Sequence, residues 1–437
     1  MERNMKIVVA VFVVIIIGMG AGLGYLLTRP PAEEEPKLVH IGGVWPLSGA
    51  FAETGTSIRR GVRMAVDEIN SNGGIESLGG KNITFHYGDH AGDPSTGATE
   101  ARRIIENFDP VLMMGCYHSS VTKTAAGVAE DYKVPHLNGE SSSPTLTQLE
   151  RKWFFRSGPH DGMFNTQQIE FVLHLDETYS DDFEDPLDTF AIIHEDTEFG
   201  TATAEDWEEK GTAAGLEHLG TISYHAETVT TLDSEVEQLK SWDPDVVFDA
   251  SYVSDAKLLV STMKAKTYMP PVFIAQDAGF IIAGYINAVG EDGYYFMTRQ
   301  TVNWDLNQSI SHLDRVVDDF NKLYGYTPGG AVLRDYAAVK VAALAIEEAG
   351  KHADLSDLET FRDEVRKALL NMDIDAPSDA VPMPWEGVKF NQTTHQNIYA
   401  AGVICQMMPD DGLYHTVYPT AFATRDPIVP LPGWDER

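Results

Sequence analysis

The sequence has few cysteines and few basic residues, and both shortages narrow the possible functions. Only Cys116 and Cys405 occur in 437 residues, so the sequence leaves open a disulfide between them or two buried thiols. The 32 Lys and Arg residues stand against 66 Asp and Glu residues, a formal net charge of −34. This excess of negative charge argues against nucleic-acid binding and against adsorption to anionic lipid. It indicates a solvated acidic surface and does not identify a ligand.

Catalytic motifs are also missing from the sequence. It contains no Gly-x-Ser-x-Gly elbow and no Walker loop, and the motif that begins at His194 lacks the second His of a zinc protease helix. His86, Asp89, His90 and Asp93 lie within eight residues, but His86 and Asp89 leave a strand on different sides. We therefore expect no enzyme, no metal site and no cofactor.

The N-terminal region has no charge between Ile7 and Leu27, about the length needed to span a bilayer. Arg3 and Lys6 precede this run and favour a cytoplasmic N-terminus. We expect residues 1–28 to be a membrane anchor, residues 29–37 to be a Pro- and Glu-rich linker, and the remainder to lie outside the cell. A cleaved signal segment is the alternative, although the apolar run is long for one.

The rest of the chain alternates short buried strands with helices. A strand at Ile41–Trp45 precedes a helix whose apolar face carries Ile58 and Val62, while Arg59 stays exposed. Further segments follow the same pattern: strands at 111–115, 134–137, 190–194, 246–249 and 272–275, a helix at 119–132, and a C-terminal hairpin from residue 398. Such alternation predicts an α/β fold with parallel sheets covered by helices. Roughly 400 residues exceed one hydrophobic core, so we expect at least two lobes.

Three loops at the carboxyl ends of strands are candidates for a ligand site. The first is Leu47–Gly55, which contains Phe51. In the second, Ser119 and Ser120 stand where a strand gives way to a helix, so that free N–H groups and a hydroxyl converge on a possible anion site. In the third, Ser143 is expected to cap a helix that begins at Pro144. Helix capping alone is the alternative role for these serines.

The motifs PLSGAFAETG, RRGVRMAVDEIN, NGGI and DHAGDP resemble the periplasmic binding proteins for branched-chain amino acids that feed ABC importers. The resemblance runs from about Val39 to Tyr418. It implies the type I periplasmic binding protein fold, with two Rossmann-like lobes joined by three crossings. The implied crossings lie near 156–159, 297–301 and 388–392. Lobe 1 would comprise 38–157 with 298–388, and lobe 2 would comprise 158–297 with 389–437.

The resemblance also implies which residues bind the ligand. Ser119 and Ser143 match the positions that hold the carboxylate and amino group of an amino acid, Ser141 matches a main-chain contact, and Asp277 matches the partner of the ligand ammonium. The further implied contacts are Asp161 beside the ammonium and the aromatic residues Phe199 and Tyr252 over the ligand. Phe199 and Thr54 depart from the residues common at their positions, so hydroxyl or aromatic contacts there are lost. Three polar residues are expected at the rim of the pocket: Tyr117, His118 and Glu140.

The expected function is therefore a membrane-tethered extracellular receptor that closes on an amino acid and delivers it to an ABC transporter permease. A receptor for amides, urea or aromatic carboxylates is an alternative in the same fold. A sensory ligand-binding protein with a separate signalling partner is an alternative of a different class.

Overall fold

The computed structural model describes residues 38–226, 228–310 and 312–437. Residues 39–437 form one compact unit, to which every element named below belongs. The predicted anchor at 1–28 and linker at 29–37 lie outside the described residues. Within the described ranges, none of the helices has the length and apolar character needed to cross a membrane.

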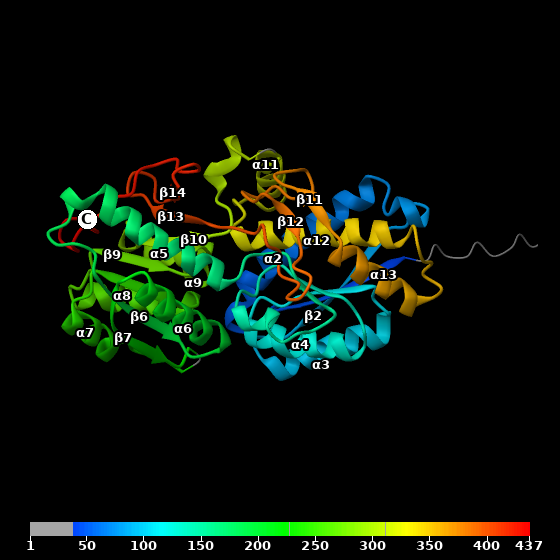
Figure 1. Cartoon of the computed structure of the whole chain (residues 1–437), viewed down its shortest axis with the longest axis horizontal. Helices are drawn as coiled ribbons and strands as arrows, with labels where there is room; N and C mark the ends of the chain where they lie inside the picture. Colours follow the sequence, from blue (N-terminus) through cyan, green and yellow to red (C-terminus); the bar gives the residue numbers. More distant parts are fainter. Residues whose placement is uncertain (1–37, 227, 311) are drawn as a thin grey trace, which may run out of the picture. The chain divides into compact units, whose positions relative to one another are not determined.

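The first half of the unit is built on a five-stranded parallel sheet with the strand order β2-β1-β3-β4-β5. The strands are β1 (Val39–Trp45), β2 (Ile83–Asp89), β3 (Leu112–Gly115), β4 (His136–Asn138) and β5 (Phe154–Arg156). The helices packed in pairs on this sheet are α2 (Ala52–Ser71) with α12 (Gly330–Ala349), and α3 (Pro94–Phe108) with α4 (Ser119–Asp131). Figure 1 labels strand β2 and the helices α2, α3, α4 and α12 of this region. The predicted strands and helices in this region are confirmed to within a few residues.

Alternating side chains along β1 bind the two helical layers to this sheet. Ile41 and Trp45 are fully buried in the same apolar cluster as Val62 of α2. Val44, which points to the other face of the strand, is buried in a separate cluster with Ile104 of α3. A strand buried on both faces has few polar side chains along its length, and the segment Ile41–Trp45 has none.

The second half is built on a seven-stranded sheet with the order β14-β13-β10-β9-β8-β6-β7. Its parallel strands are β6 (Thr189–Glu195), β7 (Glu217–Tyr224), β8 (Val246–Ala250), β9 (Val272–Ala275) and β10 (Met297–Gln300). The last two strands, β13 (Val403–Met407) and β14 (Tyr414–Tyr418), run antiparallel and form the predicted C-terminal hairpin. This sheet is therefore mixed, where the sequence predicted parallel strands.

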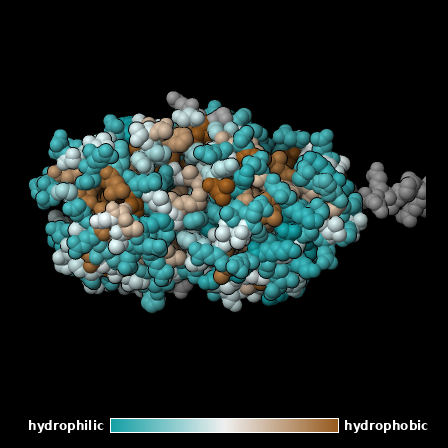
Figure 2. All heavy atoms as spheres, in the orientation of Figure 1, coloured by the Kyte–Doolittle hydropathy of each residue, from teal (hydrophilic) through white to brown (hydrophobic). Residues whose placement is uncertain are grey.

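The remaining elements cover the sheets and connect them. The helices of the second half are α5 (Asp161–Thr178), α6 (Glu198–Ala213), α7 (Asp233–Trp242), α8 (Val253–Ala265), α9 (Asp277–Phe280) and α10 (Ala283–Val289). The later elements are α11 (Leu313–Tyr324), α13 (Leu358–Leu370), β11 (Asp373–Asp375) and β12 (Gly387–Lys389). The face drawn in Figure 2 is mostly hydrophilic with separate apolar patches, as the acidic composition predicts.

The chain passes between the two sheets three times. The first passage lies between the end of β5 and the start of α5, and the second follows β10, close to the predicted positions. The third lies later than the predicted 388–392, because Gln396 still bridges to Arg156 at the end of β5 and Asn397 bridges to Phe390. The next strand of the second sheet begins only at Val403.

Candidate functional site

One buried arginine holds the serine-rich loop that follows β4. Arg156, the last residue of β5, donates to the carbonyl oxygens of Ser141 at 3.2 Å and Ser143 at 2.7 Å. It also donates to Thr147 Oγ1 at 2.8 Å and to Gln396 Oε1 at 2.6 Å. Burial lowers the pKa of Arg156 to about 9. The guanidinium thereby fixes the loop to the end of the first sheet.

Ser119 and Ser143 lie side by side, although they are 24 residues apart. Ser119 is the first residue of α4 and is buried, and its Oγ accepts a hydrogen bond from the Ser143 N–H at 3.2 Å. Ser120 follows on α4 and is half-buried. The structure thus brings together the two serines predicted to hold a carboxylate, and their contact with a ligand stays a prediction.

Ser143 stands at the predicted N-cap position, before a short 3₁₀ helix at Pro144–Thr147, but its side chain does not cap the helix. Its hydroxyl lies 3.0 Å from Thr145 Oγ1 and donates to Glu198 Oε1 at 3.4 Å, because a carboxylate is a better acceptor than a main-chain group. The N–H and carbonyl of Ser141 are both bound to the Asn138 side chain, at 3.0 and 2.7 Å.

Glu198 links the loops of the first sheet to the second half of the unit. It is the first residue of α6, and its carboxylate accepts hydrogen bonds from Thr145 and Ser143. Lys123 of α4 forms an ion pair with the same carboxylate at 2.9 Å. One side chain of the second half therefore holds α4 and the serine loop together.

Five buried charged side chains from both halves meet next to these loops. Arg299 of β10 pairs with Asp161 at 3.0 Å and with Asp277 at 2.6 Å. Arg334 of α12 pairs with Glu140 at 2.8 Å and with the same oxygen of Asp277 at 2.8 Å. Asp277 is thus shared by two guanidinium groups, one from each half. We call these five residues the charge cluster.

The charge cluster contains more negative than positive groups. Glu140, Asp161 and Asp277 oppose only two arginines, and Asp335, next to Arg334 in sequence, is also fully buried. Burial raises the pKa of Asp161 to about 6 and that of Asp335 to about 7, and it raises the pKa of Glu140 well above its usual range. The arginines oppose these shifts without cancelling them. The site therefore favours an added proton or an added cation.

The pKa of Asp161 leads to a pH prediction. The folded pKa of about 6 lies above the ordinary value of 3.8, so between these pH values the folded chain keeps a proton that the unfolded chain has lost. The contribution of Asp161 to the free energy of unfolding is full below about pH 4 and falls as the pH rises to 6. The wild type should therefore lose on the order of 2–3 kcal/mol relative to Asp161→Asn over this range in urea unfolding. A difference in the free energy of unfolding between the two proteins that stays constant from pH 4 to 6 would contradict the raised pKa of Asp161.

Aromatic rings enclose the other side of the serine loops. Phe51, just before α2, packs edge-on against His118 at 4.4 Å and against Tyr252 at 5.1 Å between ring centroids. Tyr117 packs against His118 at 4.9 Å, and Phe199 lies 5.5 Å from Tyr252. The structure thus gathers all the aromatic residues that were predicted to close over a ligand.

Tyr117, His118 and Glu140 do not form a polar rim. His118 and Glu140 are each 4 % exposed, and Tyr117 is half-buried with its hydroxyl donating to the Ala278 carbonyl at 3.3 Å. Neither ring nitrogen of His118 has a hydrogen-bond partner, and burial lowers its pKa well below the usual value, so the ring is neutral. The rim prediction was wrong because it could not include the burial that the second half provides.

Sequence reasoning missed the arginines of the site. Arg299 is the only charged residue in the run YYFMTRQTV, and Arg334 lies beside Asp335 in the largely apolar run GAVLRDYAAV. A charge in such a segment requires a buried partner. That signal was available for both residues. Their partners, more than 50 residues away for the Arg334 pair with Asp277, could not be identified from the sequence.

The described residues settle the state of the two cysteines. Cys116 and Cys405 are both buried free thiols, so no disulfide joins them. Across the part of the chain that the structure describes, no three His, Cys, Asp or Glu side chains are arranged to hold a metal ion. His90 instead bonds through its ring to the Cys116 carbonyl at 3.0 Å, and Asp93 caps α3 by accepting from the Thr96 N–H at 2.6 Å.

Comparison with known proteins gives one consistent result. A family model described as "Periplasmic binding protein" matches residues 38–404. The "Leu/Ile/Val-binding protein homolog 7" of Brucella suis is 30% identical over 399 residues, which cover 90% of this chain and 94% of that protein.

Two solved structures share the fold. One is a branched-chain amino acid transporter substrate-binding protein from Streptococcus pneumoniae in complex with isoleucine (TM-score 0.70, 18% identity, covering 88% of this chain and 100% of that one). The other is a solute-binding protein of an ABC transporter from Rhodopseudomonas palustris in complex with benzoate (TM-score 0.73, 17% identity, covering 90% and 99%). The family match over most of the chain, together with the two sheets and their three connections, shows that this chain belongs to the periplasmic binding protein family.

Proposed function

We propose that the chain is the solute receptor of an ABC importer and that it captures an amino acid outside the membrane. Membership of the periplasmic binding protein family supports this proposal, as do the names of the Brucella relatives and of the solved structures that share its fold. The partner is then the importer's permease, which receives the ligand from the closed receptor.

The unpaired oxygen of Asp161 carries the assignment to an amino acid. Asp161 is fully buried next to Asp277 and the two guanidinium groups, and its Oδ2 has no hydrogen-bond partner. An ammonium group beside Asp161 and Asp277 would donate to this oxygen, since a buried charge is tolerated when it is paired. The carboxylate of the same ligand would reach Ser119 and Ser143, which lie at the start of α4.

Closure of two lobes is the proposed mechanism. We assign 38–156 with 301–397 to the first lobe and 157–300 with 398–437 to the second, which moves the boundaries expected from the sequence to the ends of the observed strands. The pair between Arg334 and Asp277 and the pair between Lys123 and Glu198 then join the lobes. A ligand held between them stabilises the closed state by its preference for that state.

We also propose that residues 1–28 anchor the receptor to the membrane and that residues 29–37 form the linker to the lobes. The uncharged run Ile7–Leu27 supports the anchor, and the Pro- and Glu-rich composition supports the linker. The lobes would then remain close to the permease without being embedded in the bilayer.

The variant Asp277→Asn tests the amino-acid assignment. Charge-assisted hydrogen bonds contribute about 1.5 to 3 kcal/mol each. Loss of the Asp277 carboxylate should therefore weaken the binding of an amino acid by roughly tenfold or more. The affinity for the matching deaminated acid should fall much less. Thermal-shift screening first identifies the best amino acid, and calorimetry then compares both ligands on the variant, the wild type and the surface control Asp67→Asn. Equal losses for the two ligands would refute the ammonium assignment.

A receptor for aromatic carboxylates is the second candidate. One observation favours it: Asp277 already has Arg299 at 2.6 Å and Arg334 at 2.8 Å, so its negative charge is matched without a ligand. The Rhodopseudomonas protein with bound benzoate shares the fold. In this case, deaminated aromatic acids should bind the wild type more tightly than the corresponding amino acids.

A further inference from the structure

A large apolar cavity lies between the two halves, away from the serine loops. Its volume is about 510 Å³, within the range of about 300–1,000 Å³ that is typical of small-molecule sites. One wall comes from the start of α2 and from the segment before α12, and the opposite wall comes from residues 281–286, 300–304 and 413–414. Apolar side chains from both walls face it, including Ile58, Ile281, Ile286, Val302, Val332 and Leu413.

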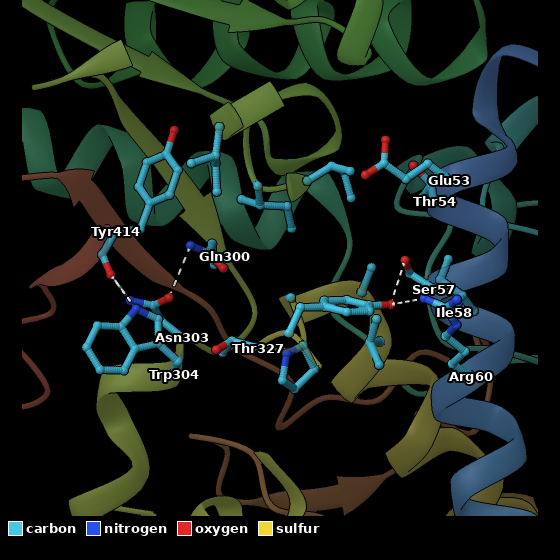
Figure 3. A pocket seen from close by; sticks show the side chains of 18 of the residues that line it. Glu53, Thr54, Ser57, Ile58, Arg60, Gln300, Asn303, Trp304, Thr327 and Tyr414 are labelled. Carbon is cyan, nitrogen blue, oxygen red and sulfur yellow. Dashed lines mark hydrogen bonds between the residues drawn. The ribbon is translucent and has the colours of Figure 1, made fainter. Parts of the chain in front are cut away.

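Several polar groups of the cavity wall bind one another (Figure 3), although the Glu53 carboxylate also lines the cavity and the Tyr414 hydroxyl has no hydrogen-bond partner. Asn303 Nδ2 and Trp304 Nε1 both donate to the Tyr414 carbonyl, at 2.7 and 3.0 Å. On the α2 side, the Tyr326 hydroxyl donates to Ser57 Oγ at 3.0 Å and accepts from Arg60 at 3.1 Å. Because these groups are paired and most of the lining is apolar, the cavity suits a largely apolar group.

Two elements connect the cavity to the charge cluster. On α12, Ala331 lines the cavity, and Arg334 lies three residues further on the same side of the helix. At α9, Ile281 lines the cavity four residues after Asp277. Arg334 and Asp277 pair at 2.8 Å, so α12 and the end of α9, which both contribute to the cavity wall, also meet in the charge cluster.

We infer that the ligand has a large apolar body, aromatic or long-chain, that occupies this cavity while its charged head lies at the charge cluster. The inference rests on the proposed function and specifies the class of its ligand. A branched aliphatic side chain has only a handful of carbon atoms and would leave most of the cavity empty. Each additional buried methylene contributes about 0.8 kcal/mol, so larger side chains should bind more tightly.

Calorimetry with a series of amino acids tests the size preference. Alanine, leucine, phenylalanine and tryptophan share one head group and differ in the apolar body. Phenylalanine or tryptophan should bind at least about tenfold more tightly than leucine. The same series without the amino group runs from propionate to indole-3-propionate. It measures how affinity depends on the size of the apolar body when no ammonium group is present.

Gly329 allows a matched pair of variants that fills the cavity. This residue lines the cavity and has φ −79° and ψ 170°, which any residue adopts. A Cβ there would meet only the Ile281 carbonyl oxygen, at an ordinary contact distance of 3.6 Å. Gly329→Leu should lower the affinity for the aromatic ligands at least tenfold and leave the affinity for the small ligands nearly unchanged. Gly329→Ala should bind both kinds of ligand like the wild type. Urea unfolding of both variants confirms that they fold.

The outcomes separate this inference from the proposed function. If leucine binds as tightly as tryptophan and Gly329→Leu affects neither, the cavity does not hold the ligand body, while the amino-acid function stands. If only the deaminated aromatic acids bind and Gly329→Leu weakens them, the cavity assignment holds and the ammonium assignment fails. If no member of either series binds, both are refuted.

Discussion

Replacement of Arg299 by Met is expected to lower the free energy of unfolding by about 3–5 kcal/mol, the usual effect of removing one partner from a buried ion pair. Asp161 pairs with Arg299 at 3.0 Å, and both side chains are fully buried. The variant therefore leaves the Asp161 carboxylate inside the protein without its cation. Urea unfolding at pH 7 measures the change.

Two further variants test this explanation. Arg63→Met removes an exposed ion pair with Asp67 on α2, and its effect should stay within about 0.5 kcal/mol. Arg299→Met combined with Asp161→Asn should recover part of the lost stability, because the second change removes the unpaired charge. A single variant Arg299→Met that loses less than about 1 kcal/mol would show that the pair does not hold the charge cluster together.

Arg156→Met should reduce both stability and ligand affinity. The guanidinium makes four hydrogen bonds, to Ser141, Ser143, Thr147 and Gln396, and hydrogen bonds to charged groups contribute about 1.5–3 kcal/mol each. We expect a loss of about 3 kcal/mol in urea unfolding, with part of the bonding replaced by water. Because the serine loop loses its support, calorimetry should also show at least tenfold weaker binding.

Arg156→Lys is the matched control for this prediction. Lysine keeps the positive charge but has no planar guanidinium group to reach all four acceptors. The stability and the ligand affinity of this variant should therefore lie between those of the wild type and Arg156→Met. A variant Arg156→Met that binds ligand with full affinity would mean that the serine loop keeps its position without the arginine.

The sequence predicted the elements of this fold better than it predicted the site. The strand at Ile41–Trp45 and the helix that carries Ile58 and Val62 were predicted correctly, because periodic burial depends on neighbours in the sequence. The convergence of Ser119 and Ser143 was also predicted, since parallel strands end at one edge of a sheet.

The charge cluster could not be predicted in the same way. Glu140 was expected at a polar rim, and its burial depends on Arg334, which lies 194 residues later on another element. The partners of Arg299 come from α5 and α9, and only the folded chain brings them together. The predicted ligand contacts of Asp161 and Asp277 likewise remain untested, because their observed partners are protein side chains.

The C-terminal hairpin has a consequence for how the chain folds. β13 and β14 complete the edge of the second sheet beside β10, yet they are the last strands in the sequence. Until residues 403–418 have been synthesised, β10 presents an unpaired row of N–H and carbonyl groups that invites pairing with other chains. The second sheet is therefore finished only after residue 418 has been synthesised, and a folding intermediate without this hairpin would expose the edge to other chains.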